Sequence, residues 1–91
     1  MKYEVKVTGA FKRSFKKCIK RGLDENIFIK AISILAETGS LPDKYKPHRL
    51  HGNYEGCWEC HLQPDWLMIW RQNDRELFIM LVDTGTHSDL F

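Results

Sequence analysis

The sequence predicts an α+β domain with an N-terminal strand, a helical hairpin and an antiparallel β-meander. Three observations predict it: an alternating apolar segment at the start, helical periodicity up to residue 40, and three strand-like segments in the second half. Because the helices precede the strands rather than alternating with them, we expect both helices to pack on one face of the sheet. The 91 residues are enough for a single domain, 1–91, with a modest core.

The N-terminal strand is expected where three apolar residues alternate with polar ones, which gives the strand one buried face. These residues are Tyr3, Val5 and Val7. The period then changes, because apolar residues recur at the spacing of an amphipathic helix with cations between them. They are Phe11, Phe15, Cys18 and Ile19. Gly22 is placed to end this first helix.

A second helix is expected from Asp24, whose side chain can cap it, to the turn at residues 38–40. Its apolar positions are Ile27, Phe28, Ala31, Ile32, Ile34 and Leu35. The short connection between the two helices predicts a hairpin. Residues 41–56 are rich in Pro, Gly, Asn, Lys and His, and they predict a long ordered loop with a short strand near Arg49–His51.

Three further strands are expected at Cys57–Leu62, Trp66–Arg71 and Glu76–Val82, with turn residues between them. Side chains alternate along a strand, so Trp58, Cys60 and Leu62 share the more apolar face of the first one. That face should contact the helices. Glu59 and His61 are therefore expected on the open face of the sheet.

The charge distribution is asymmetric. Of the 14 lysines and arginines, all but Arg49, Arg71 and Arg75 lie in residues 1–46. Most of them gather in the predicted first helix, as Lys12, Arg13, Lys16, Lys17, Lys20 and Arg21. Such a cluster attracts a polyanion or an acidic partner, although a solvated helix face is the simpler alternative.

The chain has no apolar run long enough to cross a bilayer and no secretory signal, which predicts a cytoplasmic protein without membrane contact. An odd number of cysteines, three, favours reduced thiols. The string from Cys57 to His61 matches a haem-attachment pattern. Alternation along a strand sends Cys57 and Cys60 to opposite faces, which disfavours haem and also a zinc site using both. We expect one of them in the core and the other partly buried.

All four histidines lie in the second half, as His48, His51, His61 and His87. Histidine is the usual proton shuttle at neutral pH, so these residues indicate acid–base chemistry. Asp65 lies in the turn after His61 and could approach that ring, although a plain turn residue is the alternative. Trp66 could stack on a base or be an ordinary strand aromatic.

Three strings together resemble the YafQ-like branch of the RelE/ParE toxin superfamily. They are residues 45–52 (YKPHRLHG), 56–70 (GCWECHLQPDWLMIW) and 84–91 (TGTHSDLF), and the resemblance extends over essentially the whole chain. It implies a RelE-like microbial RNase fold. It also implies a type II toxin–antitoxin toxin that cleaves mRNA on the ribosome, without a cofactor or a metal. A cognate antitoxin would hold it inactive in a hetero-oligomer.

The resemblance also implies site residues. The catalytic groups fall on His48, His61, Asp65 and His87, with Trp66 and Phe91 as neighbours. Two positions depart from the family pattern. Asp83 stands where some relatives have a basic residue, which removes a possible phosphate contact, and His51 replaces a residue that is not histidine in relatives.

The mechanism implied is metal-free cleavage in which the 2′-OH of the RNA attacks the phosphate. His48 and His87 would act as base and acid in either order, and Asp65 and His61 would orient them or take one of those roles. Lys46, Arg49 and Arg71 are candidates for charge neutralisation, and the cationic first helix for contacts with ribosomal RNA or the antitoxin. Three alternatives remain open: a superfamily member that inhibits a protein such as gyrase, a decayed toxin that only binds its antitoxin, and a small metal-binding domain.

Overall fold

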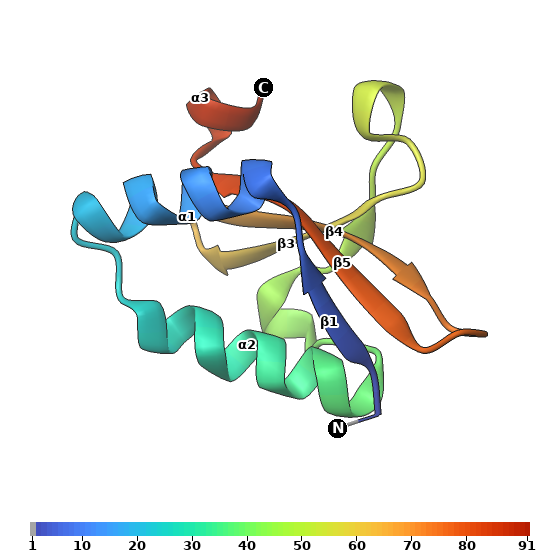
Figure 1. Ribbon diagram of the computed structural model, residues 1–91. Coiled ribbons are helices and arrows are strands. Elements are labelled where there is room, and N and C mark those ends of the chain that lie inside the picture. The colour runs from blue at the N-terminus through green and yellow to red at the C-terminus, as the bar shows by residue number, and fades with distance from the viewer. Residues whose placement is uncertain (1) are drawn as a thin grey trace.

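The computed structural model describes residues 2–91 and arranges them as a five-stranded sheet with two long helices on one face (Figure 1). The first half contains β1 (Glu4–Val7), α1 (Gly9–Lys20) and α2 (Glu25–Thr38). The second half contains β2 (His48–Arg49), β3 (Trp58–Gln63), β4 (Trp66–Asn73), β5 (Phe78–Gly85) and α3 (His87–Leu90). Two 3₁₀ turns, η1 (Asp43–Tyr45) and η2 (Gly52–Tyr54), flank β2.

The sheet has the strand order β1-β5-β4-β3-β2, and its last four strands are antiparallel neighbours. β1 pairs with β5 in parallel. A parallel pair needs a long connection between its two strands, and here the connection contains both long helices. The predicted fold class is confirmed. The short strand in the long loop lies at His48–Arg49 and so begins one residue earlier than expected.

Both long helices begin at side-chain caps. The hydroxyl of Thr8 accepts a hydrogen bond from the backbone N–H of Phe11 at 3.0 Å, and the carboxylate of Asp24 accepts one from Asn26 at 2.9 Å. α2 ends at Thr38 and is followed by the C-cap residue Gly39, which has a φ of 79°. A Cβ on this residue would lie 2.5 Å from the hydroxyl of Tyr3, so both the backbone angle and the close contact require glycine.

The main core lies between the two long helices and one face of the sheet. Phe28 of α2 contacts Phe11 and Phe15 of α1, with ring centroids 5.7 and 4.8 Å apart, and this contact joins the helices. On β3, Cys60 and Leu62 belong to this core and Trp58 packs against it, as the alternation predicts. The expectation that one of the neighbouring cysteines is only partly buried is wrong, because Cys57 and Cys60 are both buried.

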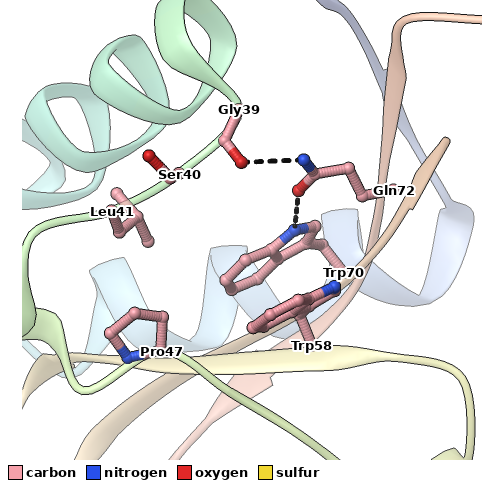
Figure 2. A pocket seen from close by; sticks show the side chains of 7 residues that line it. All are labelled: Gly39, Ser40, Leu41, Pro47, Trp58, Trp70 and Gln72. Atoms are coloured by element: carbon pink, nitrogen blue, oxygen red, sulfur yellow. Dashed lines mark hydrogen bonds between the residues drawn. The ribbon is translucent and has the colours of Figure 1, made fainter. Parts of the chain in front are cut away.

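The C-terminal end of α2 is tied to the sheet through Gln72 (Figure 2). Its amide nitrogen donates to the carbonyl of Gly39 at 2.8 Å, and its amide oxygen accepts from Nε1 of Trp70 at 2.9 Å. Trp70 stacks on Trp58 with ring centroids 6.2 Å apart. These rings and Pro47 line a small apolar cavity of about 150 Å³. The cavity lies on the helix side of the sheet, whereas Glu59 and His61 point to the other side.

The other face of the sheet also contains buried residues. Leu67 and Ile69 of β4 point away from the long helices and yet are fully buried. Tyr54 of η2 and Phe91 at the chain end contact each other edge to face, with ring centroids 5.9 Å apart. Figure 1 shows that α3 and the loop with η2 both lie at the upper end of the molecule. Within residues 2–91 no helix is long and apolar enough to span a membrane.

Candidate active site

Strand register brings the three candidate histidines together. Leu67 of β4 pairs with His61 of β3 on one side and with Gly85 of β5 on the other. His61 and Gly85 are therefore level across the sheet, and His87 lies two residues after Gly85. On the opposite edge His48 of β2 pairs with Glu59. Glu59 lies two residues before His61 and therefore on the same face of the sheet.

The result is a row of three imidazole rings, in the order His48, His61, His87. The ring centroids of His48 and His61 are 6.2 Å apart, and those of His61 and His87 are 5.7 Å apart. The side chains at the two ends are 46% and 54% exposed, so a polymer could reach both. We call these three side chains the histidine row. Sequence reasoning from the residues alone could not join its two ends, because they are 39 positions apart in the chain.

Asp65 contacts a different histidine from the one we expected. Its Oδ1 accepts a hydrogen bond from the backbone N–H of His87 at 2.9 Å and lies 2.6 Å from Nδ1 of the same residue. These hydrogen bonds lower the pKa of the Asp65 carboxyl group. His61 instead has its Nδ1 3.4 Å from the carbonyl of Pro64. The register between β3 and β4 shifts between His61 and Gln63, and the carboxylate of Asp65 in the following turn faces the start of α3.

The base of α3 is fixed independently of Asp65. Thr86 and Asp89 form a capping box, and Asp89 also pairs with Arg21 at the end of α1, at 2.6 Å. The Arg21 guanidinium lowers the pKa of Asp89. A side chain at Gly85 would bring its Cβ to 2.8 Å from that of Asp89, so glycine is required there. Arg21, which we expected to contact RNA or an antitoxin, is thus used to hold the helix that carries His87.

The cations near the histidine row differ partly from those predicted. Lys46 and Lys44 line a hollow of about 260 Å³ together with His61 and Pro64, and Lys44 had not been singled out. Arg71 lies farther along the same face of the sheet, where it donates to the carbonyl of Glu55 at 3.4 Å. Only the two lysines therefore lie directly beside the row.

Arg49 is on the opposite face from the histidine row. Its guanidinium lies over the ring of Trp58, 5.1 Å from the ring centroid. Trp58 packs against the core on the helix side. Arg49 and its neighbour His48 diverge because successive side chains of a strand point to opposite faces. In this arrangement Arg49 does not neutralise charge at the row.

The two aromatic candidates also separate. Trp66 is fully buried in the main core, and its Nε1 donates to the hydroxyl of Thr84 at 2.9 Å. Its ring is thus an ordinary core aromatic and is not available to stack on a base. Phe91 is 65% exposed and could contact a substrate. The difference follows from position, since Trp66 begins a central strand whereas Phe91 follows α3, outside the sheet.

The cationic cluster on α1 is solvent-exposed, including Arg21 at its end. Its other members are Lys12, Arg13, Lys16, Lys17 and Lys20. Three of these, Lys12, Arg13 and Lys16, line an open hollow of about 520 Å³. The walls of that hollow include Phe11, Phe15 and Phe28. Contact with ribosomal RNA or an antitoxin remains a prediction for this surface.

The cysteines and His51 are not among the candidate proton-transfer groups. Burial raises the pKa of the Cys60 thiol to about 12 and also raises that of Cys18, so both are protonated at neutral pH. His51 is exposed in the loop before η2. Within residues 2–91, no group of three His, Cys, Asp or Glu side chains is arranged to hold a metal ion.

Two acidic residues complete this face of the sheet. Asp83 pairs in register with Ile69, and its Oδ1 accepts the backbone N–H of Thr84 at 2.8 Å. Glu59 is almost entirely buried, and its Oε1 lies 3.1 Å from Nε2 of His48. Sequence reasoning placed Glu59 on the correct face but gave it no role. Its position two residues before His61 was the available signal.

Comparison with known proteins places the chain in a family. Residues 3–91 match the family model described as bacterial toxin of type II toxin-antitoxin system, YafQ. The mRNA interferase toxin YafQ of Escherichia coli K12 is 32% identical over 89 residues, which is 97% of this chain and 95% of that protein.

Solved structures agree with this assignment. YafQ from E. coli BL21(DE3) has a TM-score of 0.89 at 30% identity, over 98% of both chains. A metal-bound toxin from Helicobacter pylori has a TM-score of 0.88 at 34% identity, over 98% of this chain and 99% of that one. A chain of the E. coli DinJ-YafQ complex has a TM-score of 0.87 at 30% identity, over 98% of both chains. The chain therefore belongs to the YafQ family of bacterial toxins of type II toxin–antitoxin systems.

Proposed function

We propose that this chain is an mRNA endoribonuclease that acts on the ribosome and is held inactive by a cognate antitoxin. The observation that carries the proposal is the histidine row, with ring centroids 6.2 and 5.7 Å apart and Asp65 bonded to His87. Three imidazoles on one open face can supply every proton transfer that RNA cleavage needs. The relatives named mRNA interferase toxin YafQ point to mRNA as the substrate.

The proposed reaction uses the RNA's own 2′-OH as the nucleophile. A base removes the 2′-OH proton while the 2′-oxygen attacks the adjacent phosphorus. The bond from phosphorus to the 5′-oxygen breaks, and an acid gives a proton to that oxygen. The products are a 2′,3′-cyclic phosphate and a 5′-OH. Because two histidines in opposite protonation states can do both transfers, the proposal requires no metal ion.

His87 is the best-defined proton-transfer group. A carboxylate can only accept, so the hydrogen bond to Asp65 places a proton on Nδ1 of His87 and leaves its Nε2 to face the substrate. This is the arrangement in which an acidic partner fixes the tautomer and the orientation of a catalytic imidazole. His48 and His61 supply the complementary group. Asp65 is thus a positioning residue in the proposed reaction.

The RNA strand would pass along the open face beside the row. The hollow lined by Lys44, Lys46 and His61 offers two ammonium groups for the phosphate next to the scissile one. Phe91 is exposed and could stack on a base at the other end. The exposed cations of α1 would contact ribosomal RNA, which also explains the expected dependence on the ribosome.

The antitoxin is the second proposed partner. The solved complex of a relative with DinJ is a toxin–antitoxin complex, and this chain matches its toxin over 98% of its length. We expect a corresponding hetero-oligomer here. The cytoplasm, where ribosomes and mRNA are found, is the proposed location.

A purified translation system tests the proposal directly. The wild-type chain should cleave mRNA on ribosomes, whereas free mRNA should stay intact. His87→Ala should lower the cleavage rate by about 10²- to 10⁴-fold, and His51→Ala, an exposed loop histidine, should not. A loss of less than about tenfold in His87→Ala would remove that residue from the mechanism. No cleavage by the wild type would favour a protein-inhibiting or decayed toxin instead.

A further inference from the structure

Glu59 is the only buried charged side chain among residues 2–91 and has no role in the mechanism above. It is 4% exposed and is the second residue of β3, on the face that carries the histidine row. Its Oε1 is 3.1 Å from Nε2 of His48. Its Oε2 is buried without a hydrogen-bond partner. A carboxylate in this position is costly unless a cation compensates its charge.

The two nitrogens of the His48 ring both face acceptors. Nδ1 lies 2.8 Å from the carbonyl oxygen of Lys46, which can only accept a hydrogen bond, so Nδ1 carries a proton. Nε2 faces the carboxylate of Glu59. An ionised carboxylate is also only an acceptor, so this contact requires a second proton on the ring. The hydrogen bond at Nδ1 and the 3.1 Å contact at Nε2 are together those expected of an imidazolium paired with a buried carboxylate.

The surrounding charges favour the same state. Imidazole is a stronger base than a carboxylate, and nearly half of the His48 side chain is exposed, so water can solvate the cation. Opposite Glu59 on β4 is the apolar Ile69, which offers no competing cation. Beyond it on β5 lies Asp83, whose negative charge on the same face also favours a positive His48.

Four cationic or titratable groups near this face oppose that preference, namely His61, Arg71 and the two lysines beside the row, Lys44 and Lys46. The ring of His61 is 6.2 Å from that of His48, so both rings cannot be protonated without repulsion. Arg71 is on the same face of β4, two residues beyond Ile69 and away from the row. The buried carboxylate of Glu59 is in direct contact with the His48 ring at 3.1 Å, whereas the ring centroid of His61 is 6.2 Å from that of His48.

We propose that Glu59 is a positioning residue that keeps a proton on Nε2 of His48, so that His48 is the acid of the reaction and not its base. The general base is then His87 or His61. This inference rests on the proposed ribonuclease function for its catalytic consequence, but the protonation of His48 does not depend on that function. In the reaction, the half-exposed His48 ring turns its Nε2–H from Glu59 to the 5′-oxygen of the leaving group, the proton passes to that oxygen as the P–O5′ bond breaks, and the ring becomes neutral.

Nitrogen NMR of the free protein tests the protonation without any RNA. Long-range ¹H–¹⁵N correlation spectra at about pH 7.5 should show both ring nitrogens of His48 protonated in the wild type. In Glu59→Gln, which keeps the shape and removes the charge, His48 should show a neutral tautomer at the same pH. Glu55→Gln removes an exposed carboxylate from the preceding loop and should leave the wild-type spectrum. A neutral His48 in the wild type, or no change in Glu59→Gln, overturns the inference.

Cleavage assays test the catalytic consequence separately. An acid must be protonated to act, so cleavage by Glu59→Gln should fall off at a lower pH than cleavage by the wild type. We expect a loss of about 10²-fold at pH 8, with a much smaller loss at pH 6. An equal loss at both pH values would indicate a structural role only and would reject the assignment of His48 as the acid. If the wild type cleaves no mRNA while the NMR result holds, the ribonuclease proposal fails and the protonation of His48 stands.

Discussion

Asp65 holds His87 by two hydrogen bonds to a single oxygen, Oδ1, which lies 2.9 Å from the backbone nitrogen and 2.6 Å from Nδ1. This pair connects the β3–β4 turn to the start of α3 and fixes both the position and the tautomer of one imidazole. The other two rings of the histidine row are placed by strand pairing. Within the histidine row, His87 is therefore the ring whose position depends on a side-chain hydrogen bond rather than on strand pairing.

Asp65→Asn should lower mRNA cleavage by about 10²-fold or more under conditions in which the variant is folded. An asparagine oxygen can still accept from the backbone N–H, but the carboxylate that orients the His87 ring is lost. Rates from single-turnover cleavage on ribosomes measure the effect. Asp43→Asn, at an exposed acid in η1, is the matched control. Equal rates for both variants would mean that Asp65 is only a turn residue.

Trp66→Phe should lower the free energy of unfolding by about 2 kcal/mol, because it removes buried ring volume and leaves the Thr84 hydroxyl without its donor. Urea unfolding followed by circular dichroism measures this loss. Cleavage by the folded protein should change little at a temperature where the variant remains folded. A stable variant with strongly reduced cleavage would instead support stacking of Trp66 on a base.

Lys44→Ala and Lys46→Ala should each weaken binding of single-stranded RNA and reduce its salt dependence. A lysine that contacts a phosphate of single-stranded RNA contributes about 0.7 to the slope of log affinity against log salt. Fluorescence anisotropy with a labelled oligonucleotide at several salt concentrations measures this slope. Lys6→Ala, at an exposed lysine of β1, is the control with the same change of charge. A slope unchanged from that of the control would exclude the hollow beside His61 as a phosphate site.

Acid should destabilise the fold through a small set of carboxylates. The pKa of Asp65 is lowered by His87, that of Asp89 by Arg21 and that of Asp74 by Tyr3. A pKa that is lower in the folded state adds stability above the unfolded value, near pH 4, and this stability is lost as the pH falls through the folded value. Urea unfolding between about pH 3 and 7 should therefore show decreasing stability below about pH 4.

Asp89→Asn provides the internal test of this pH dependence. The variant lacks the carboxylate that pairs with Arg21, so its stability should be lower at neutral pH and should change less on acidification. Amide hydrogen exchange in α3 should also become faster, because the pair and the capping box fix that helix. An acid dependence as steep as that of the wild type would show that other carboxylates are responsible.

The sequence by itself determined the order of the elements and the faces of the strands. Apolar spacing separated the two long helices from the strands, and Asp24 marked a cap that the structure contains. Alternation along β3 placed Glu59 and His61 on the open face. These properties depend on neighbours within a few residues, and a sequence displays such neighbours directly.

Only the tertiary structure decided which side chains meet. It bonded Asp65 to His87 instead of His61, turned Arg49 to the opposite face from His48, and buried Trp66 in the core. It also placed a nearly buried carboxylate, Glu59, against His48. Each of these contacts depends on the register between strands distant in sequence, and on how a turn directs the chain. Register is set by the packing of the whole sheet, which no local spacing in the sequence specifies.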